Sequence, residues 1–309
     1  MPTPAIAAFT RRRALGLAAS SLLWPVAARS QEPPSSPIED RLIDNLLTRI
    51  GVEVDLGGGR RSVFVIDTGA ERTSVSDRLA REIGWPPGPE VIVHGITAAQ
   101  RTATVALPRL KVLQQSFDHL SAPVFSHDLL GADGFLGLDV LARFRLSLDF
   151  QRQRAVLAPS GRSRLFTGVG APPLRRVNPA LGGARRTRNG QLLLSSVETG
   201  GGVIDAFIDS GAQYSVGNRA LAALAGPEEG RIQLLGVVGG ALSATQRSLP
   251  DLRIARRRFG LTSLLFADLH AFNILGLVER PAILLGADLL TRFRRIMLDY
   301  GEGRIAFDD

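Results

Sequence analysis

Short stretches in which apolar residues alternate with polar ones or run together recur along the chain after residue 40, bounded by glycine, proline and small polar residues. Such stretches are typical of β-strands, whereas apolar residues at helical spacing are few. The pattern therefore predicts an all-β protein with few short helices. The predicted strands span residues 50–56, 62–66, 91–96, 102–107, 146–150 and 155–157, then 191–197, 204–208, 232–237, 244–249, 296–300 and 304–307.

The two halves of the chain present these elements in the same order. Each half has a hairpin that leads into an Asp, then a second hairpin that a proline ends, at Pro108 and at Pro250. An apolar strand ending in Gly follows, with an Asp (Asp139, Asp288) expected to cap the helical turn after it. This order predicts two matching lobes, residues 40–158 and 189–309, related by a pseudo-twofold axis.

The most informative repeat is the turn after the first hairpin, Asp67-Thr68-Gly69-Ala70 in one half and Asp209-Ser210-Gly211-Ala212 in the other. An isolated Asp-Thr-Gly is an ordinary turn. Two copies in matching surroundings instead favour a paired site, because a pseudo-twofold axis brings Asp67 against Asp209. Two carboxylates that share a proton can act as general base on a water and as general acid on a carbonyl oxygen, without a cofactor. The chain has no Cys, no Gly-x-Ser-x-Gly and no His-Glu-x-x-His to offer a competing mechanism.

The paired motif resembles the aspartic peptidases, and more narrowly the retropepsin-like proteins, over nearly all of residues 40–309. The resemblance implies a two-lobed acid-protease-like β fold and catalysis by Asp67 and Asp209. It also implies that Gly69 and Gly211 support the pair and that Thr68 and Ser210 interlock the two turns. Phe135-Leu136-Gly137 and Leu284-Leu285-Gly286 would brace the turns from beneath.

The second hairpins would then be flaps that close over a peptide or protein substrate in extended conformation, with Gly95, Ile96, Gly236 and Val237 at their tips. Retroviral members of the group assemble the site by homodimerising. Here a single chain holds both halves, as in pepsin, so a monomer is expected.

Three departures from the family pattern stand out. Neither predicted flap has the Tyr of pepsin-like flaps, since the only tyrosines are Tyr214 and Tyr300. The second turn reaches its apolar residue, Val216, one position sooner than the first, which suggests that the second lobe is the more divergent. Ala70 and Ala212 stand where pepsin-like enzymes commonly have a hydroxyl that donates to the carboxylate, so we expect the pair to titrate higher and to work at mildly acidic to near-neutral pH.

The N-terminal residues have the pattern of an export signal. Arg11, Arg12 and Arg13 precede an apolar run that ends in small residues near Ala28, and this run is too short to span a bilayer as a helix. The arginine pair followed by Leu15 is typical of a twin-arginine signal, with a general secretory signal as the alternative. Residues 1–30 are therefore expected to direct the protein to the periplasm or outside the cell, and residues 31–39 form a tether.

Charge and composition limit the kinds of partner that the sequence gives reason to expect. The net charge is +8, and residues 1–30 hold four Arg and no acid, which leaves +4 for the rest. This modest balance gives no reason to expect a nucleic-acid partner. The four His are scattered and suggest no metal site. Residues 159–188 are rich in Arg, Gly and Pro and are expected to form a solvated linker rather than a basic docking surface.

The sequence therefore predicts an exported aspartic endopeptidase that needs no cofactor or metal. A protein of the same fold that binds extended peptides without cleaving them, or cleaves them only weakly, is the alternative, since fold does not fix function. A third hypothesis is that the lobes pair between chains, so that activity needs a dimer.

Overall fold

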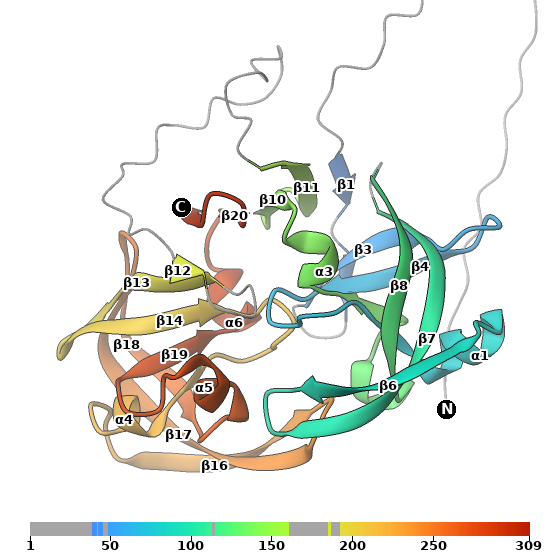
Figure 1. Cartoon of the computed structure of the whole chain (residues 1–309). Coiled ribbons are helices and arrows are strands. Elements are labelled where there is room, and N and C mark those ends of the chain that lie inside the picture. Colours follow the sequence, from blue (N-terminus) through green and yellow to red (C-terminus); the bar gives the residue numbers. More distant parts are fainter. Residues whose placement is uncertain (1–38, 42, 46–48, 113–114, 161–184, 187–191) are drawn as a thin grey trace, which may run out of the picture. The chain divides into compact units, whose positions relative to one another are not determined.

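The computed structural model describes residues 39–41, 43–45, 49–112, 115–160, 185–186 and 192–309, all within one compact unit (Figure 1). The expected signal, nearly all of the expected tether and most of the expected linker lie outside the described residues. The described part is built mostly from strands, with six short helices. The predicted all-β, two-lobed acid-protease-like fold is confirmed.

The first lobe is an eight-stranded sheet in the order β2-β3-β4-β9-β5-β8-β7-β6, and an additional pairing of β3 with β7 curls it toward a barrel. Its strands are β2 (Ile43–Asn45), β3 (Arg49–Asp55), β4 (Arg61–Ile66), β5 (Ser74–Ser76), β6 (Pro87–His94), β7 (Ala99–Val112), β8 (Gln115–Phe125) and β9 (Gly134–Leu136).

The second lobe repeats this topology in the order β12-β13-β14-β19-β15-β18-β17-β16, with β13 also pairing with β17. Its strands are β12 (Arg185–Arg186), β13 (Leu192–Thr199), β14 (Gly202–Ile208), β15 (Val216–Gly217), β16 (Glu228–Gly236), β17 (Gly240–Ile254), β18 (Arg257–Phe266) and β19 (Ala282–Leu285).

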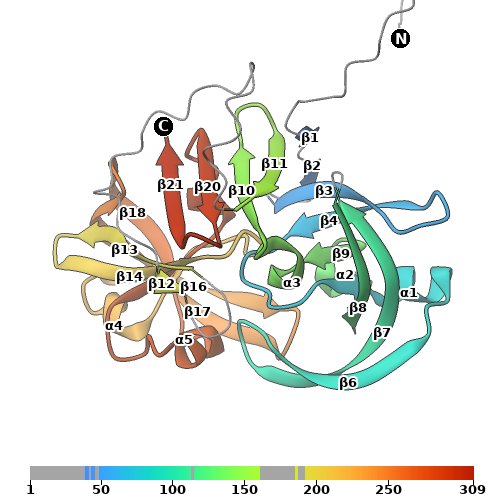
Figure 2. The ribbon, with the colours of Figure 1, turned by 45° about the horizontal axis from the view of Figure 1, so that its top comes forward.

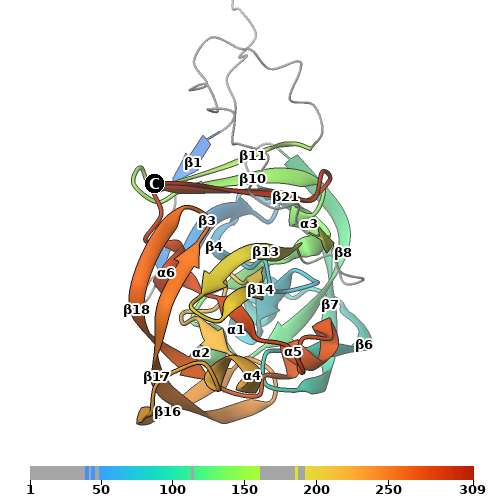
Figure 3. The same cartoon turned by 90° about the vertical axis from the view of Figure 1, so that its left-hand side faces the viewer.

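A five-stranded sheet joins the two halves of the chain, in the order β1-β11-β10-β20-β21 (Figure 2). Its strands are β1 (Glu39–Arg41), β10 (Phe144–Asp149), β11 (Arg154–Pro159), β20 (Arg295–Asp299) and β21 (Arg304–Asp308). Within this sheet, the two halves of the chain meet at the antiparallel pair β10–β20, in which Leu146 lies opposite Leu298. Figure 3 views this sheet nearly edge-on.

The short helices close the lobes. They are α1 (Asp77–Ile83), α2 (His127–Leu130), α3 (Leu138–Leu141), α4 (Arg219–Ala222), α5 (His270–Leu275) and α6 (Ala287–Leu290). Ser76 and Asn218 cap α1 and α4 by accepting backbone N–H groups from Leu79 and Leu221, at 3.1 and 2.8 Å. These two caps stand 142 positions apart, the same separation as Asp67 and Asp209.

This constant separation corrects one interpretation of the sequence. Ser74 pairs with Phe135 in the first lobe, and Val216 pairs with Leu284 in the second, at the same step after the Asp. Val216 therefore replaces Ser74 without any shortening of the turn. Its earlier position reflects a substitution and gives no sign that the second lobe diverges more.

The predicted hairpin ends are also wrong. Strand β7 continues through Pro108 to Val112, and β17 continues through Pro250 to Ile254. Both prolines sit beside irregular backbone: His119, across from β7, has φ 58°, and Asp251 has φ 49° where the β17–β18 register shifts. The register shifts beside Pro250, whereas at Pro108 the register is unchanged and only the pairing with His119 is missing. A proline is tolerated at either place because no ladder hydrogen bond needs its missing N–H.

Candidate active site

Asp67 and Asp209 follow directly from β4 and β14, so each begins a turn on rigid backbone. Their amides donate to the carbonyls of Leu136 and Leu285, at 2.9 and 3.0 Å, which anchors each turn to the strand beneath it. Within the first turn, Gly69 and Ala70 donate N–H groups to Oδ1 of Asp67, at 2.9 and 3.0 Å. Gly211 and Ala212 donate in the same way to Oδ1 of Asp209, both at 3.0 Å. One oxygen of each carboxyl is thus held by its own turn.

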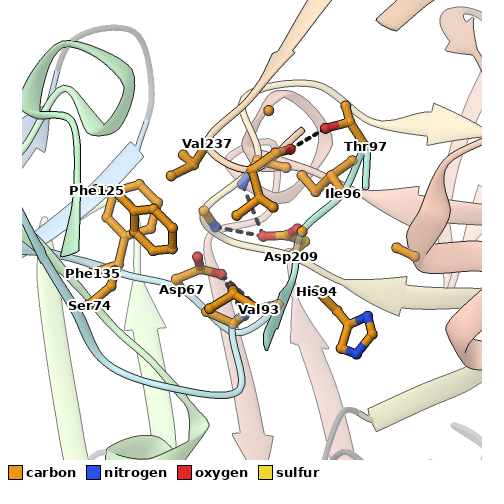
Figure 4. Close-up of a pocket in the computed structure, with 18 of the residues that line it drawn as sticks. Asp67, Ser74, Val93, His94, Ile96, Thr97, Phe125, Phe135, Asp209 and Val237 are labelled. Carbon is orange, nitrogen blue, oxygen red and sulfur yellow. Dashed lines mark hydrogen bonds between the residues drawn. The ribbon is translucent and has the colours of Figure 1, made fainter. Parts of the chain in front are cut away.

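The two turns meet face to face. A methyl group at Gly69 would lie 2.6 Å from Cγ of Asp209, and a methyl group at Gly211 would lie 2.6 Å from Cγ of Asp67. Only glycine leaves room for this approach. The two Asp residues are 8% and 5% exposed, and Figure 4 shows their side chains next to each other at the cavity.

Burial raises the pKa of Asp209 well above its ordinary value, and the negative charge of Asp67 raises it further. The N–H donors of Ala212 and Gly211 act in the opposite direction, while a hydrogen bond between the two Asp side chains again raises the pKa. A buried pair of this kind holds on to one proton because both members cannot ionise cheaply.

The hydroxyls next to the pair link the two turns by four hydrogen bonds. Thr68 donates its hydroxyl to the carbonyl of Ile208 at 2.9 Å, and Ser210 donates its hydroxyl to the carbonyl of Ile66 at 2.5 Å. Each backbone N–H donates to the hydroxyl oxygen of the other residue, at 3.2 and 3.1 Å. Both hydroxyl residues are buried. The two Asp residues are therefore held at a fixed separation by bonds that belong to both lobes.

Strands β9 and β19 lie beside β4 and β14 and carry the two apolar-apolar-Gly segments. Gly137 donates its N–H to the hydroxyl of Thr73 at 3.1 Å, and Gly286 donates to the hydroxyl of Ser215 at 2.9 Å. A methyl group at Gly286 would lie 2.5 Å from the carbonyl carbon of Tyr214. These segments therefore contact the turns directly.

Asp139 and Asp288 each accept one backbone N–H of the first helical turn, from Val140 and Leu289 at 2.9 Å, although Gly137 and Gly286 occupy the N-cap positions. Their main partners lie in the turns that follow Asp67 and Asp209. Asp139 accepts the N–H and the hydroxyl of Thr73, at 2.9 and 2.7 Å, and Asp288 accepts the same groups of Ser215, at 2.9 and 2.6 Å. Burial raises the pKa of Asp139, against the bonds from Thr73 that lower it. Both carboxyls fix the far end of an active-site turn, a role signalled in the sequence only by their repetition.

The four predicted flap residues all line one cavity of about 490 Å³, together with Asp67 and Asp209. Gly95 and Ile96 lie at the tip between β6 and β7. Gly236 ends β16, and Val237 begins the tip between β16 and β17. The tips touch: Thr97 donates its hydroxyl to the carbonyl of Val238, and a methyl group at Gly95 would lie 2.6 Å from Cβ of Val238.

Each flap tip also packs against the opposite lobe. Ile96 contacts a buried cluster of the second lobe that includes Phe207 and Leu284. Val237 contacts a cluster of the first lobe that includes Leu130 and Phe135. The tips therefore cross, and together with the turns they enclose the cavity from both sides.

One flap contact was missed by the sequence reasoning. Nδ1 of His94, at the end of β6, lies 3.1 Å from Nε2 of His270, at the start of α5, and the two rings are nearly parallel, with centroids 5.4 Å apart. Two of the four scattered His thus meet across 176 positions. No local pattern signals such a pair.

Within the part of the chain that the structure describes, no group of three or more His, Cys, Asp or Glu side chains is placed to hold a metal ion.

Among the described residues, no helix has both the length and the apolar character needed to cross a bilayer.

Residues 52–143 match the family described as gag-polyprotein putative aspartyl protease. A solved structure, a retropepsin-like aspartic protease from Rickettsia conorii, aligns with 38% of this chain and 89% of its own length, at 18% identity and a TM-score of 0.30. No curated protein sequence matches the chain.

Proposed function

We propose that this protein, retropepsin-like by the match of residues 52–143 and by its two-lobed fold, is an exported aspartic endopeptidase whose catalytic pair comes from both lobes. The observation that carries the proposal is the contact of Asp67 with Asp209 at a cavity closed by two flaps, with the pKa of Asp209 raised. Peptide hydrolysis needs a base and an acid on either side of one water, and a carboxyl pair that keeps one proton supplies both.

In the proposed reaction, the ionised Asp takes a proton from a water held between the carboxyls, and the oxygen of that water attacks the scissile carbonyl carbon. The protonated Asp donates its proton to the carbonyl oxygen. The tetrahedral intermediate then collapses: the C–N bond breaks, a proton passes to the leaving nitrogen, and the products are a carboxylic acid and an amine. The flaps exclude bulk water and hold the peptide extended between them.

The cavity suits a peptide with apolar side chains. Its walls include Phe125, Leu130 and Phe135 from the first lobe and Phe207, Leu275 and Leu284 from the second. Ile92 and Leu235 line it from the two flaps although they are 62% and 73% exposed, so apolar surface is available to a ligand.

The test is digestion of a diverse peptide library by the purified protein, with Asp67→Asn and Asp209→Asn as matched variants. We expect cleavage by the parent and loss of at least about a thousandfold in kcat/KM in either variant, because each lacks one of the two proton-transfer roles. Circular dichroism should show that both variants stay folded. A parent that binds peptides but cleaves none, with binding unaffected by either substitution, would support the non-catalytic alternative.

Export through residues 1–30 is the second part of the proposal, supported by the arginines and the apolar run after them. Cell fractionation should recover the protein outside the inner membrane. Replacing Arg12 and Arg13 with Lys should retain it in the cytoplasm if the twin-arginine route is used. Unchanged export would indicate the general secretory route, and cytoplasmic parent protein would contradict export itself.

A further inference from the structure

Two pairs of equivalent positions in the lobes differ by one charge each, and the first pair flanks the catalytic turns. Glu71 and Gln213 stand 142 positions apart, like Asp67 and Asp209. The backbone fixes them in the same way, since the carbonyl of Glu71 accepts the N–H of Asp139 and that of Gln213 accepts the N–H of Asp288, both at 3.1 Å. Both residues line the cavity. One side of the cleft thus has a carboxylate where the other has the amide of the same shape.

The second pair lies on the short helices α2 and α5. Each helix ends at a glycine in left-handed conformation, Gly131 with φ 63° and Gly276 with φ 67°. Counted back from these glycines, Asp128 corresponds to Asn273, and the two residues in between are apolar in both lobes and line the cavity. Here again the first lobe has the acid and the second lobe has its amide.

The two acids of the first lobe are available to a ligand. Glu71 and Asp128 are exposed, and among the described residues no ion pair within 4.0 Å involves either of them. Burial raises the pKa of Asp139, and the charge of the nearby Arg72 acts weakly against it. Arg72 also lines the cavity, so Glu71 and Asp128 leave the first-lobe side with one negative charge in excess. The matching position in the second lobe is the neutral Tyr214.

We propose that Glu71 and Asp128 are specificity-determining residues, which bind a Lys or Arg side chain of the substrate and thereby fix the direction in which an extended peptide lies across the cleft. A pseudo-symmetric pair of carboxyls does not by itself distinguish the two directions of a peptide. A cationic side chain does, because only the first-lobe side offers it carboxylates. This inference rests on the proposed peptidase function and names a feature of its substrate.

The test compares peptides that carry Arg or its neutral isostere citrulline at each of several positions on either side of one cleavable bond, at pH 7.5 and low salt. We expect Arg to raise kcat/KM about two- to fivefold on one side of the bond only, which is the upper part of the range that exposed ion pairs give. The preference should shrink at 0.5 M salt because salt screens exposed charges.

Matched variants locate the preference. The double variant Glu71→Gln, Asp128→Asn should lose it. The reciprocal variant Gln213→Glu, Asn273→Asp should gain a second preference on the other side of the bond. The control variant Asp118→Asn, Glu302→Gln also removes two negative charges, at positions that do not line the cavity, and it should retain the parent preference. An equal preference on both sides, or a preference that survives Glu71→Gln with Asp128→Asn, would overturn the inference while leaving peptidase activity established.

A binding measurement separates this inference from the proposed function. The variant Asp209→Asn, titrated with the same peptides by fluorescence anisotropy, should bind the Arg peptide more tightly than the citrulline peptide. If the parent cleaves nothing, the peptidase proposal fails, and this binding difference still decides the charge preference. Equal binding of the two peptides would overturn it.

Discussion

Asp209 keeps a proton in the folded protein that it loses in the unfolded chain near its ordinary pKa of 3.8. Between that value and the raised folded pKa, the folded state binds more protons, so the free energy of unfolding falls as pH rises through this window. The backbone N–H groups of Gly211 and Ala212 donate to Oδ1 alone. They can therefore bind both the protonated and the ionised carboxyl of Asp209. The active site therefore lowers the stability of the protein at neutral pH.

Replacing Asp209 with Asn should raise the melting temperature by several degrees at pH 7. The amide keeps the acceptor for Gly211 and Ala212, donates to Asp67 and has no proton to lose. The gain should be smaller at pH 4, because Asp209 of the unfolded chain, with its ordinary pKa of 3.8, is then partly protonated as well. Calorimetry at the two pH values measures the difference. Asp118→Asn, which breaks an exposed ion pair with Arg109, should change the melting temperature little. A variant less stable than the parent at pH 7 would contradict this account.

The activity profile should respond to position 212. Ala212 donates only its backbone N–H to Asp209, so Ala212→Ser adds a hydroxyl donor that favours the ionised carboxylate. The alkaline limb of kcat/KM should then move down by roughly half a pH unit, the shift that a hydrogen bond of ~0.7 kcal/mol produces. A pH–rate profile of parent and variant measures it. A parent optimum near pH 2 would contradict the expectation drawn from Ala70 and Ala212.

At the residue scale, local sequence predicted the turns because their requirements are local. Asp at the end of a strand, a hydroxyl residue, and Gly where the opposing carboxyl approaches are dictated within four positions. The roles of Asp139 and Asp288 depend on Thr73 and Ser215, 66 and 73 positions away. A sequence pattern shows that these residues recur, and only the packed structure shows what they bind.

At the scale of elements, the sequence predicted the local features of the flaps but not the contacts that depend on distant residues. The alternation predicted both hairpins and their tips, but it ended β7 and β17 too early because Pro108 and Pro250 read as breakers. Strands β8 and β18, which pair with β7 and β17 and so add a third strand to each hairpin, were not predicted. The crossing of Ile96 and Val237 to opposite lobes follows from the meeting of two distant hairpins, for which no local pattern exists.

The close contact between the two flap tips leaves no room for a side chain at Gly95. Gly95→Ala places a methyl group 2.6 Å from Cβ of Val238, so the crossed tips must separate. We expect kcat/KM to fall about tenfold or more, since the flaps no longer close fully over the peptide, with little change in melting temperature. Gly230→Ala on β16 is the matched control, because its methyl group meets only Gln246 at 3.7 Å. Equal activity of both variants would show that tip contact is dispensable.

At the scale of the whole described unit, the five-stranded sheet makes the two lobes one structure. Strand β10 of the first half pairs with β20 of the second over five residue pairs, and buried Leu146 and Leu298 lie opposite each other in the same hydrophobic core as Phe64 and Ile208. Together with the four hydrogen bonds of Thr68 and Ser210, this sheet holds both catalytic turns within a single chain. We therefore expect one chain to suffice for the site.

A mixing experiment tests this directly. Asp67→Asn and Asp209→Asn each keep one intact turn, so a dimer that paired lobes from two chains would rebuild a complete pair in a mixture of the two variants. A site assembled within one chain would not, and we expect the mixture to stay as inactive as each variant alone. Sedimentation of the parent should correspondingly show a monomer whose specific activity is independent of concentration. Recovery of activity in the mixture, growing with protein concentration, would demonstrate that the lobes pair between chains, because only exchange of lobes brings an unaltered Asp67 against an unaltered Asp209.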